Sequence, residues 1–525
     1  MKKIAALAMA AAMIMGLPGF AAREDNSIVY SLNAEPKRLD VCAEEDNFRL
    51  MGQLVQSLLE LDENGQPAPG AAESYAVSED GKTYTFTLRA DGKWWDGERV
   101  TAQDFCYGWT QLLKNGSGSP YAEMGYCIQN AQAYAQGRVE AEVLGLRAAD
   151  ERTFEVTLER PMADFPYLAA CVGFAPRRQD YDERYGAEYG TDAEKIMGNG
   201  AYRLAEWKPE EQITLVKNER YYARDQIAIE RLVGVKVRDA AQAYALFEEG
   251  ALDMVDLNAT TSLLAEQNGR AVQSHSDGTV CFLQMNCEQG PTANANIRRA
   301  LGLAVNRRNL VNNVLRDNSL PALSFARADF RNRKGKPFSE GVSVDYQDAD
   351  AEKAALCWAQ GLEELGMSPA EAASAIQLVL GEDDLSKQQA IALRRDWKAA
   401  LGVEIKIEHL SEEERVQRVR DGAYGVTIES WRADCASPAA FLEYAVETRG
   451  WNGAECRELV QSARAQTDLE KRMELLNRAE TILLSEMPLA PLYFPMRDAA
   501  LADGLWGVRR SAFGQDDFKN AGWSE

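Results

Sequence analysis

The sequence predicts a mixed α/β protein made of about three folding units. The chain has 525 residues, of which 46% are hydrophobic, and this is more than one core uses at roughly 150 residues per domain. Short runs with strand-like alternation occur along the chain, and long runs with helical periodicity dominate its second half. No internal repeat interrupts this mixture. These observations favour several α/β units over a repeat or an all-helical architecture.

The first half of the chain contains strand patterns and one clear helix start. Residues 27–32 have the composition of an opening strand, and residues 84–89 alternate strictly between polar and apolar side chains. Lys93 to Trp95 follow a turn and are predicted to return as the second strand of a hairpin. Thr101 and Asp104 have the spacing of a capping box that opens a helix. Further strands are expected at residues 152–158 and 212–217.

The second half of the chain is dominated by helical periodicity. The predicted helices cover residues 297–315, 351–365, 387–401 and 457–484. A strand is expected at residues 403–408, between two of these helices. Because strands alternate with helices here, the pattern predicts a covered and largely parallel sheet.

The charge composition excludes several classes of protein. The chain has 58 Lys and Arg against 81 Asp and Glu, a net charge of -23. An acidic surface of this kind repels phosphate backbones and anionic lipid headgroups, so no nucleic-acid partner is expected. His275 and His409 are the only histidines, which leaves little material for a metal site or for acid–base catalysis.

The N-terminus predicts export. Lys2 and Lys3 precede an apolar run at residues 4–15, and Gly19 and Ala21 place small residues at the spacing of a cleavage site. Residues 1–21 therefore resemble a cleavable signal peptide, and the mature chain is expected to begin at Ala22. No cysteine lies near this cut, so no lipid anchor is evident. The expected location is periplasmic or otherwise extracytoplasmic.

The common catalytic templates are incomplete. No Gly-x-Ser-x-Gly string occurs, and Gly81-Lys82-Thr83 has Ala76 where a P-loop requires glycine. Gly198-Asn199-Gly200 has Arg203 at the third glycine position of a dinucleotide fingerprint. The nine cysteines form no Cys-x-x-Cys pair, which argues against zinc. We therefore predict no catalytic residues, cofactor or metal, and we expect a protein that is not an enzyme.

Six strings resemble, in the same order, the signature of one transport family. They are Asp80–Arg89 with Trp94–Glu98 and Val100–Phe105; Gly198–Leu204 with Trp207–Pro209; Asn218–Tyr222; Glu249–Asp253; Asn286 with Ile297–Leu301 and Ala304–Arg307; and Trp431–Asp434 with Pro438 and Phe441–Leu442. The family is that of the family 5 extracellular solute-binding proteins of ABC importers, which includes oligopeptide- and dipeptide-binding proteins. The resemblance extends from about residue 28 to residue 522.

The resemblance implies a two-lobed, periplasmic-binding-protein-like fold of type II, cluster C, with a hinge and an extra inserted domain. Projected onto this chain, lobe I comprises residues 27–59, 191–275 and 490–525, and the inserted domain II comprises residues 60–190. Lobe II, or domain III, comprises residues 276–489. The ligand is expected between the lobes, which close about the hinge.

The function implied by the resemblance is capture of oligopeptides and their delivery to the permease subunits of an ABC importer, by a protein expected to be a monomer. Alternatives within the family are a nickel chelate, haem or a sugar as ligand, although two histidines argue against a metal chelate. An extracellular hydrolase and a chaperone-like envelope protein remain as further alternatives.

The resemblance also implies ligand-binding residues. Asp434 is expected to pair with the α-ammonium of the ligand, with Ser430, Trp431 and Ala433 beside it. The loop at residues 42–47, which includes Glu45 and Asn47, and Tyr121 match positions that line the cleft of the family. Each has a plainer interpretation: a helix N-cap for Asp434, a core aromatic for Trp431, an exposed acidic loop for residues 42–47, and a surface turn for Tyr121.

The chain departs from a well-studied peptide-binding branch of the family at two pocket positions. Ile428 replaces an arginine and Glu412 replaces a tryptophan, so the preference for peptide length and sequence does not carry over. Some members bridge the regions of Cys281 and Cys435, and a disulfide between these two residues is therefore a hypothesis.

Overall fold

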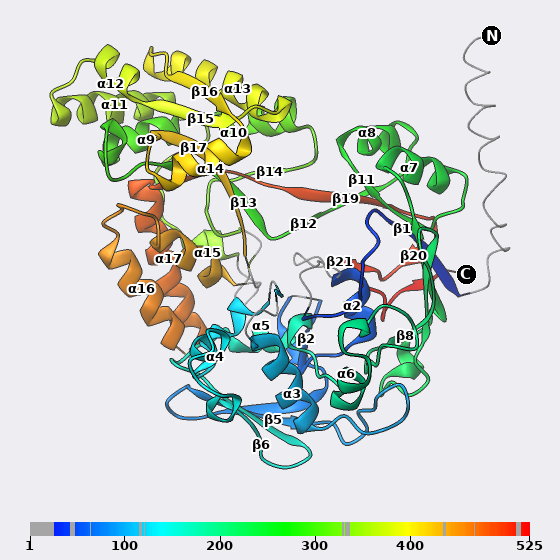
Figure 1. Ribbon diagram of the computed structural model, residues 1–525. Helices are drawn as coiled ribbons and strands as arrows, with labels where there is room; N and C mark the ends of the chain where they lie inside the picture. The colour runs from blue at the N-terminus through cyan, green and yellow to red at the C-terminus, as the bar shows by residue number, and fades with distance from the viewer. Residues whose placement is uncertain are drawn as a thin grey trace, which may run out of the picture.

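Two large β-sheets lie in two lobes, and the chain crosses between the sheets twice (Figure 1). This computed structural model describes residues 26–42, 48–63, 65–114, 118–119, 121–327, 330, 337–433, 437–466, 468–510 and 516–524. The first crossing leads from β12 (Val272–Ser276) to β13 (Thr279–Met285), and the second leads from β18 (Leu489–Phe494) to β19 (Met496–Leu501). These short connections are the hinge of the molecule.

The sheet of lobe I has seven strands in the order β12-β19-β11-β1-β10-β9-β8. The further strands are β1 (Ser27–Leu32), β8 (Tyr202–Lys208), β9 (Gln212–Lys217), β10 (Arg231–Lys236) and β11 (Met254–Leu257). Strands β1 and β9 have the bounds that the sequence predicts. Helices α7 (Ala240–Glu248) and α8 (Ala259–Gln267) supply the side chains that pack against one face. Helix α2 (Phe48–Leu54) and the inserted sheet belong to the core on the other face.

The inserted domain is built on a four-stranded antiparallel sheet in the order β4-β5-β7-β6. Its strands are β4 (Ala72–Val77), β5 (Thr83–Leu88), β6 (Leu146–Ala148) and β7 (Thr153–Thr157). Helix α3 (Ala102–Leu113) covers this sheet and begins with the predicted capping box of Thr101 and Asp104. Trp109 of α3 lies edge-on to Phe154 of β7, with 5.2 Å between the ring centroids. The buried side chains of this domain and of lobe I form one continuous core.

The hairpin predicted at Lys93 to Trp95 is wrong. Strand β5 pairs with β4 and β7, and Lys93 instead forms an isolated bridge with Arg99. The Trp94 ring is fully buried and its Nε1 donates to Asp104. Burial of this large side chain against the start of α3 folds the segment into its own tight turn, so it does not extend along β5.

The sheet of lobe II has six strands in the order β14-β18-β13-β17-β15-β16. The further strands are β14 (Leu320–Pro321), β15 (Gln377–Gly381), β16 (Lys406–Leu410) and β17 (Val426–Arg432). The prediction of a largely parallel sheet is wrong, because only the β15–β16 and β15–β17 pairs are parallel. The chain enters lobe II through β13 and leaves through β18, and these neighbouring hinge strands run in opposite directions. Only β15, β16 and β17 are joined by the helical crossovers that parallel strands require.

Two predicted helices are each interrupted by a new helix start. The segment at residues 297–315 contains α9 (Ala295–Leu303), α10 (Arg307–Asn309) and a π-helical turn (Leu310–Leu315), because Asn306 begins a new helix as its N-cap. Residues 457–484 contain α16 (Ala454–Ala465) and α17 (Leu469–Glu486), and Asp468 caps the second helix. A side-chain cap of this kind stabilises a new helix start within a continuous helical pattern.

The further helices of lobe II lie against the two faces of its sheet (Figure 1). They are α11 (Ala351–Leu365), α12 (Pro369–Ala375), α13 (Asp384–Leu401), α14 (Glu412–Arg420) and α15 (Pro438–Val446). Helices α9, α11 and α13 supply the core on one face, and α15, α16 and α17 supply the core on the other. Among the described residues, no helix is both long and apolar enough to cross a membrane.

Glu480 of α17 makes the stability of lobe II sensitive to pH. Its side chain is fully buried, and Oε1 accepts hydrogen bonds from the backbone N–H groups of Phe325 (2.6 Å) and Ala326 (3.1 Å). Burial raises the pKa of this carboxyl to about 8. Between pH 4.5 and about 8 the unfolded chain therefore loses a proton that the folded chain retains, so stability falls as the pH rises.

Glu480→Gln is expected to remove this pH dependence. Between pH 4.5 and neutral pH the wild type should therefore lose about 3 kcal/mol of unfolding free energy that the variant does not lose. Urea unfolding of wild type and variant across this pH range measures it. Glu474→Gln, at an exposed position of the same helix, is the matched control and should follow the wild-type slope. If Glu480→Gln also follows that slope, the carboxyl of Glu480 does not titrate as stated.

Candidate functional site

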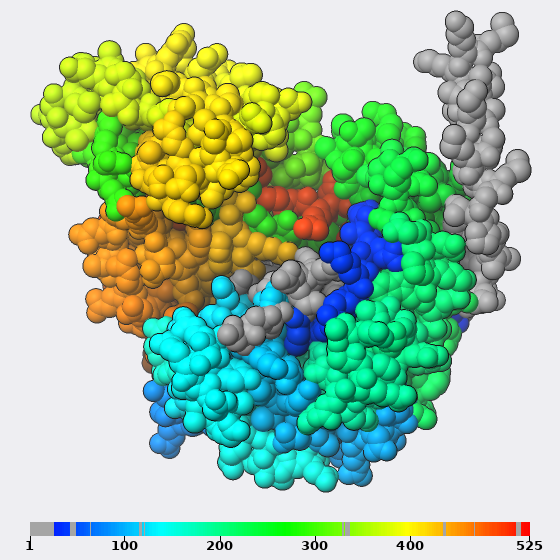
Figure 2. Space-filling view, in the orientation of Figure 1, coloured from blue at the N-terminus to red at the C-terminus, as the bar shows by residue number. Residues whose placement is uncertain are grey.

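A hollow lies between lobe II and lobe I (Figure 2). Lobe II borders it in yellow and orange, lobe I in dark blue and green, and part of the inserted domain in cyan. The red strand β19 is visible at the back of the hollow, so the hinge lies deep in it. The hollow between the lobes is the candidate binding cleft.

The hinge connects directly to the end of strand β17. Gly278 lies between β12 and β13 with φ +81°, a left-handed conformation that favours glycine. Its carbonyl accepts a hydrogen bond of 3.0 Å from the backbone N–H of Ala433, which follows β17. Across the second crossing, Asn318 of lobe II donates to the buried carboxylate of Asp498 in β19 (2.8 Å). The predicted site segment therefore begins at the hinge.

The structure places the described lobe II candidates on and after β17. Ser430 is exposed and lies opposite Cys281 of β13. Trp431 is half-buried, stacks on Tyr444 with 4.9 Å between the ring centroids, and lies edge-on to Phe441. Ala433 is buried. The contacts of Trp431 make it part of the aromatic cluster of lobe II, and its contact with ligand stays a prediction.

The predicted residues Asp434, Glu45 and Asn47 lie outside the described residues, as does Cys435. The other cysteine of the proposed disulfide, Cys281, is a buried free thiol, and burial raises its pKa to about 12. Cys42, Cys106, Cys127, Cys287, Cys357 and Cys456 are also free thiols. In the part of the chain that the structure describes, no group of three or more His, Cys, Asp and Glu side chains has the arrangement of a metal site.

Tyr121 is a buried residue in the core shared by the inserted domain and lobe I. Its ring lies against Gly173, where an added Cβ would come within 2.2 Å of the tyrosine Cγ. This close approach requires glycine at position 173. The packing accounts for Tyr121 without a ligand, and its role in the cleft stays a prediction.

The first residues of the loop predicted at residues 42–47 are held by hydrogen bonds and an ion pair. Asp40 accepts the backbone N–H of Cys42 (2.9 Å) and pairs with Arg177 of the inserted domain (2.6 Å). The hydroxyl of Ser119 donates to the carbonyl of Val41 (2.6 Å). The side chains of Asp40 and Arg177 are both buried, so the start of this loop is held against the inserted domain.

The helix that follows this loop, α2, contributes Arg49 to a network of ion pairs in lobe I. Arg49 of α2 pairs with Asp256 of β11 (2.9 Å) and with Asp516 of β22 (Asp516–Asp517) (2.5 Å). Arg510 of β21 (Arg509–Arg510) pairs with the same two carboxylates at 2.6 and 3.1 Å. Burial alone would raise the pKa of Asp256, but the two arginines lower it below its usual value. Helix α2 contacts β22, and β22 pairs with β21, so these elements lie together in lobe I (Figure 1).

No sequence pattern identifies this network, because its members come from three distant segments. The same holds for a buried trio that joins the inserted domain to lobe II. There, Arg472 of α17 pairs with Asp164, which also accepts a hydrogen bond of 3.0 Å from the Ser437 hydroxyl. Asp164 directly precedes α5 (Phe165–Ala170). Only the tertiary structure brings these groups together.

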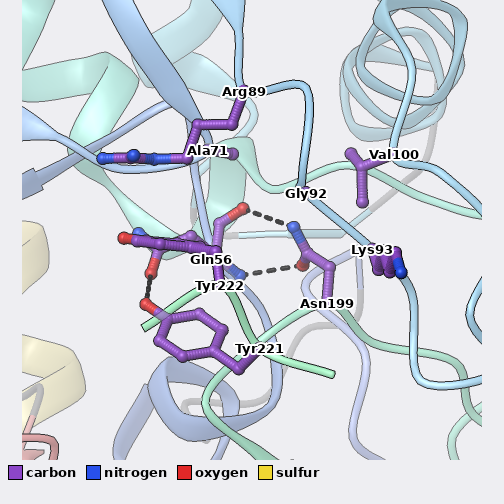
Figure 3. Close-up of a pocket in the computed structure, with 9 residues that line it drawn as sticks. All are labelled: Gln56, Ala71, Arg89, Gly92, Lys93, Val100, Asn199, Tyr221 and Tyr222. Atoms are coloured by element: carbon purple, nitrogen blue, oxygen red, sulfur yellow. Dashed lines mark hydrogen bonds between the residues drawn. The ribbon is translucent and has the colours of Figure 1, made fainter. Parts of the chain in front are cut away.

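A small pocket between the inserted domain and lobe I is lined by residues from several of the strings that resemble the family signature (Figure 3). Its volume of about 10 Å³ is no more than one water molecule occupies. Gln56 exchanges two hydrogen bonds with Asn199 (2.9 and 3.0 Å), and its side-chain oxygen accepts from the Tyr221 hydroxyl (2.7 Å). Asn199 and Tyr221 therefore hold two parts of the chain together, and the pocket is too small for a peptide.

Other members of the strings are structural as well. A Cβ at Gly198 would come within 2.1 Å of the Leu54 carbonyl oxygen, so only glycine allows this contact. Asp253 accepts the backbone N–H of Val29 in β1 (2.8 Å). Asn286 donates to the carbonyls of Gly422 and Tyr424 (2.8 and 3.0 Å). Arg307 is fully buried and donates to the carbonyl of Pro491 (2.6 Å).

The two departures from the well-studied branch have different surroundings. The carboxylate of Glu412 forms a two-point contact with Arg415, with both distances 2.8 Å, and Arg415 also pairs with Glu429 of β17. Ile428 is half-buried and packs against the core formed with α9, α11 and α13. An acidic pair around one arginine thus occupies the surface next to Ser430.

Comparison with known proteins identifies the family that has this architecture. Residues 66–453 match the family model described as bacterial extracellular solute-binding proteins, family 5 Middle. The dipeptide-binding protein DppE of Bacillus subtilis is 29% identical over 480 residues, covering 90% of this chain and 87% of the relative.

Two solved structures have the same fold over nearly the whole chain. The periplasmic murein tripeptide-binding protein MppA in its unliganded open form superposes with a TM-score of 0.83 at 25% identity, covering 95% of this chain and 98% of that chain. Haemophilus influenzae OppA in complex with the peptide RPPGFSPFR superposes with a TM-score of 0.69 at 25% identity, covering 95% and 99%. The expected two-lobed fold is confirmed. The chain belongs to family 5 of the bacterial extracellular solute-binding proteins.

Proposed function

We propose that this protein is an extracytoplasmic solute-binding protein that captures oligopeptides in the cleft between its lobes and delivers them to an ABC importer. It acts as a carrier and catalyses no reaction. The observation that carries the proposal is the similarity of the whole chain to an OppA solved in complex with a peptide. The hinge provides the motion that a carrier needs, because only two short crossings join the lobe sheets.

The structure resembles the unliganded open MppA more closely than the OppA–peptide complex, although both are 25% identical to this chain. We infer that the lobes are open here and that they close when peptide binds. Backbone hydrogen bonds hold an extended peptide in such a cleft, while hydrated side-chain pockets allow variation in its sequence.

The domain division, export and assembly belong to the same proposal. Lobe I comprises residues 27–59, 191–275 and 490–525, the inserted domain comprises 60–190, and lobe II comprises 276–489. Most strands of the three main sheets fall within these bounds, but β18 (Leu489–Phe494) pairs in the sheet of lobe II although nearly all of it lies beyond residue 489. A signal peptide at residues 1–21 directs export, and N-terminal sequencing of the exported protein is expected to begin at Ala22. The mature protein acts as a monomer with the permease subunits of its importer.

The expected result for a peptide carrier is stabilisation without cleavage. A short peptide with free termini should raise the melting temperature of the protein and remain intact by mass spectrometry. A ligand that binds only the folded state at a hundredfold excess over its Kd stabilises it by about 2.7 kcal/mol. Steady release of fragments by a homogeneous preparation would instead favour a hydrolase.

Native mass spectrometry of the protein as purified identifies the class of ligand directly. Recovery of a mixture of short peptides supports the proposal. Recovery of a nickel chelate, haem or a sugar, with no response to peptides, would replace the peptide by that solute within the same family.

A further inference from the structure

Lobe II meets the rest of the molecule at two separate places. One is the hinge, where the chain crosses from β12 to β13 and from β18 to β19. The other, which we call the inserted-domain contact, is formed by Ala163 and Asp164 of the inserted domain with Ser437, Arg464 and Arg472 of lobe II. Figure 2 shows the hinge strand β19 in red at the hollow, and the cyan inserted domain against orange lobe II away from it.

The centre of the inserted-domain contact is a buried charge pair. The side chains of Asp164 and Arg472 are only 7% and 8% exposed. Asp164 also accepts a hydrogen bond of 3.0 Å from the hydroxyl of Ser437 at the start of α15. A carboxylate buried to this extent is costly without a positive partner. Arg472 of α17 provides that partner, so each surface supplies the charge that the other needs.

The charges on the lobe II side balance only together with the inserted domain. Arg464 of α16 pairs with Glu443 of α15, which leaves Arg472 as a second cation on the same side. Asp164 supplies the second anion. These four ionic groups are therefore two of each sign, and the inserted domain contributes one of them.

A backbone hydrogen bond strengthens the same contact. The N–H of Ala163 donates to the carbonyl of Arg464 (3.0 Å). Within the inserted domain, the carbonyl of Met162 accepts the hydroxyl of Tyr84 (2.8 Å), and Tyr84 belongs to β5. The segment that meets lobe II is therefore tied to the inserted sheet and moves with it.

The hydrophobic cores divide the molecule into two bodies. One continuous core contains buried side chains of both lobe I and the inserted domain. Lobe II has cores of its own on the two faces of its sheet. Closure of the cleft is therefore a rotation of lobe II relative to lobe I and the inserted domain together.

Two bodies that stay in contact at two separate places rotate only about the line that joins those places. We propose that the inserted domain provides the second pivot of lobe closure: the hinge is the first, and the inserted-domain contact is kept while the cleft opens and closes. The contact is present in a conformation that resembles unliganded open MppA, so peptide is not needed to form it. Breaking it during closure would part a buried charge pair and weaken peptide binding, and keeping it avoids that cost. This inference rests on the proposed function, in which the lobes close on a peptide.

A reversible cross-link tests whether the contact has to open. The hydrogen bond from Ala163 to Arg464 places their α-carbons at most about 7 Å apart, near the upper limit of the span of a disulfide. Ala163→Cys combined with Arg464→Cys in the full mature protein is oxidised with copper phenanthroline and reduced again with dithiothreitol. Peptide mapping identifies the bond, and wild type under the same treatment controls for the native thiols. The reduced double variant is the reference, so loss of the Arg464 side chain affects both states equally.

The oxidised variant should bind a short peptide with a Kd within about threefold of the reduced variant by calorimetric titration. Peptide should still lower its radius of gyration in small-angle X-ray scattering, because a bond at a pivot leaves the rotation free. A larger loss of affinity on oxidation, restored by reduction, would show that the contact opens during closure and would overturn the inference. Failure of the disulfide to form would show that the two segments do not stay together in solution, and this would overturn it as well.

Arg472→Met tests the same pivot without a cross-link. It leaves Asp164 without its cationic partner and loosens the contact, so lobe II is no longer confined to one axis. The unliganded variant should have a larger radius of gyration than wild type. Its peptide affinity should fall about three- to tenfold, because a smaller fraction of molecules has the orientation that closes. Lys471→Met, at the neighbouring position whose side chain is 69% exposed, is the matched control and should change neither quantity.

Unchanged scattering and an unchanged Kd for Arg472→Met would contradict the pivot, and the cross-link decides the question if this variant does not fold. A cross-link that blocks binding overturns the inference alone, because the reduced protein still binds peptide. A wild-type protein that binds no peptide overturns the proposed function, and this inference with it. The two failures are therefore distinguishable.

Discussion

Asp434→Asn will weaken binding of a peptide with a free N-terminus by roughly thirtyfold to several thousandfold. The substitution preserves the shape of the side chain but removes its charge, so the ligand ammonium is buried in the closed cleft without a counter-charge. Truncating one side of a buried charge pair costs about 2–5 kcal/mol, and each 1.4 kcal/mol corresponds to about tenfold in Kd. Calorimetric titration of the peptide into both proteins measures the loss.

A peptide with an acetylated N-terminus is the control for this prediction. It has already lost the ammonium, so it should bind wild type poorly and be much less sensitive to Asp434→Asn. If Asp434 were only a helix cap, the substitution would lower stability without distinguishing the two peptides. Equal losses for the free and acetylated peptides would remove Asp434 from the site.

Arg49→Met will lower the free energy of unfolding by up to about 3 kcal/mol, because the 19% exposed Arg49 is one of the two cationic partners of the buried carboxylate of Asp516, which is 4% exposed. Two carboxylates, Asp256 and Asp516, are then left with Arg510 as their cationic partner in this network. Methionine retains the length of the side chain, so the loss measures charge more than packing. Urea unfolding at neutral pH gives the difference between wild type and variant.

The effect of Arg49→Met should depend on pH in the acid range. Because the pKa of Asp256 is lowered in the folded state, its contribution is present above the unfolded value of 3.8 and is lost as the pH falls below it. The difference between wild type and variant should therefore shrink in acid. Arg238→Met, at the exposed Arg238–Asp239 pair, is the matched control and should change stability little. A comparable loss for both variants would contradict the role of the network.

Local sequence signals predicted individual elements well where a short pattern determines the structure. The capping box at Thr101 and Asp104, strand β1 and helix α11 occur where the pattern places them. The same signals were wrong where a single side chain changed the outcome. Burial of the Trp94 ring prevented a hairpin, and the caps at Asn306 and Asp468 divided two helices.

The six strings that resemble the family signature predicted the family and the two-lobed fold. The structure explains why these strings identify the fold. Asn199, Tyr221, Asp253 and Asn286 form hydrogen bonds that hold distant parts of the chain together. Residues with such roles specify the fold, so a resemblance based on them identifies the architecture more reliably than the ligand. The strings themselves do not identify which peptide the cleft accepts.

The sequence alone determined the acidic character of the chain, the helix start at Thr101, several of its strand patterns, and its family. The tertiary structure decided which distant groups meet: Arg49 with Asp256 and Asp516, and Asp164 with Arg472 and Ser437. Caps and strand alternation depend on neighbours a few residues away, so they are visible in the sequence. A buried charge pair depends on the packing of whole lobes, because residues hundreds of positions apart must lose water together before their attraction offsets the cost.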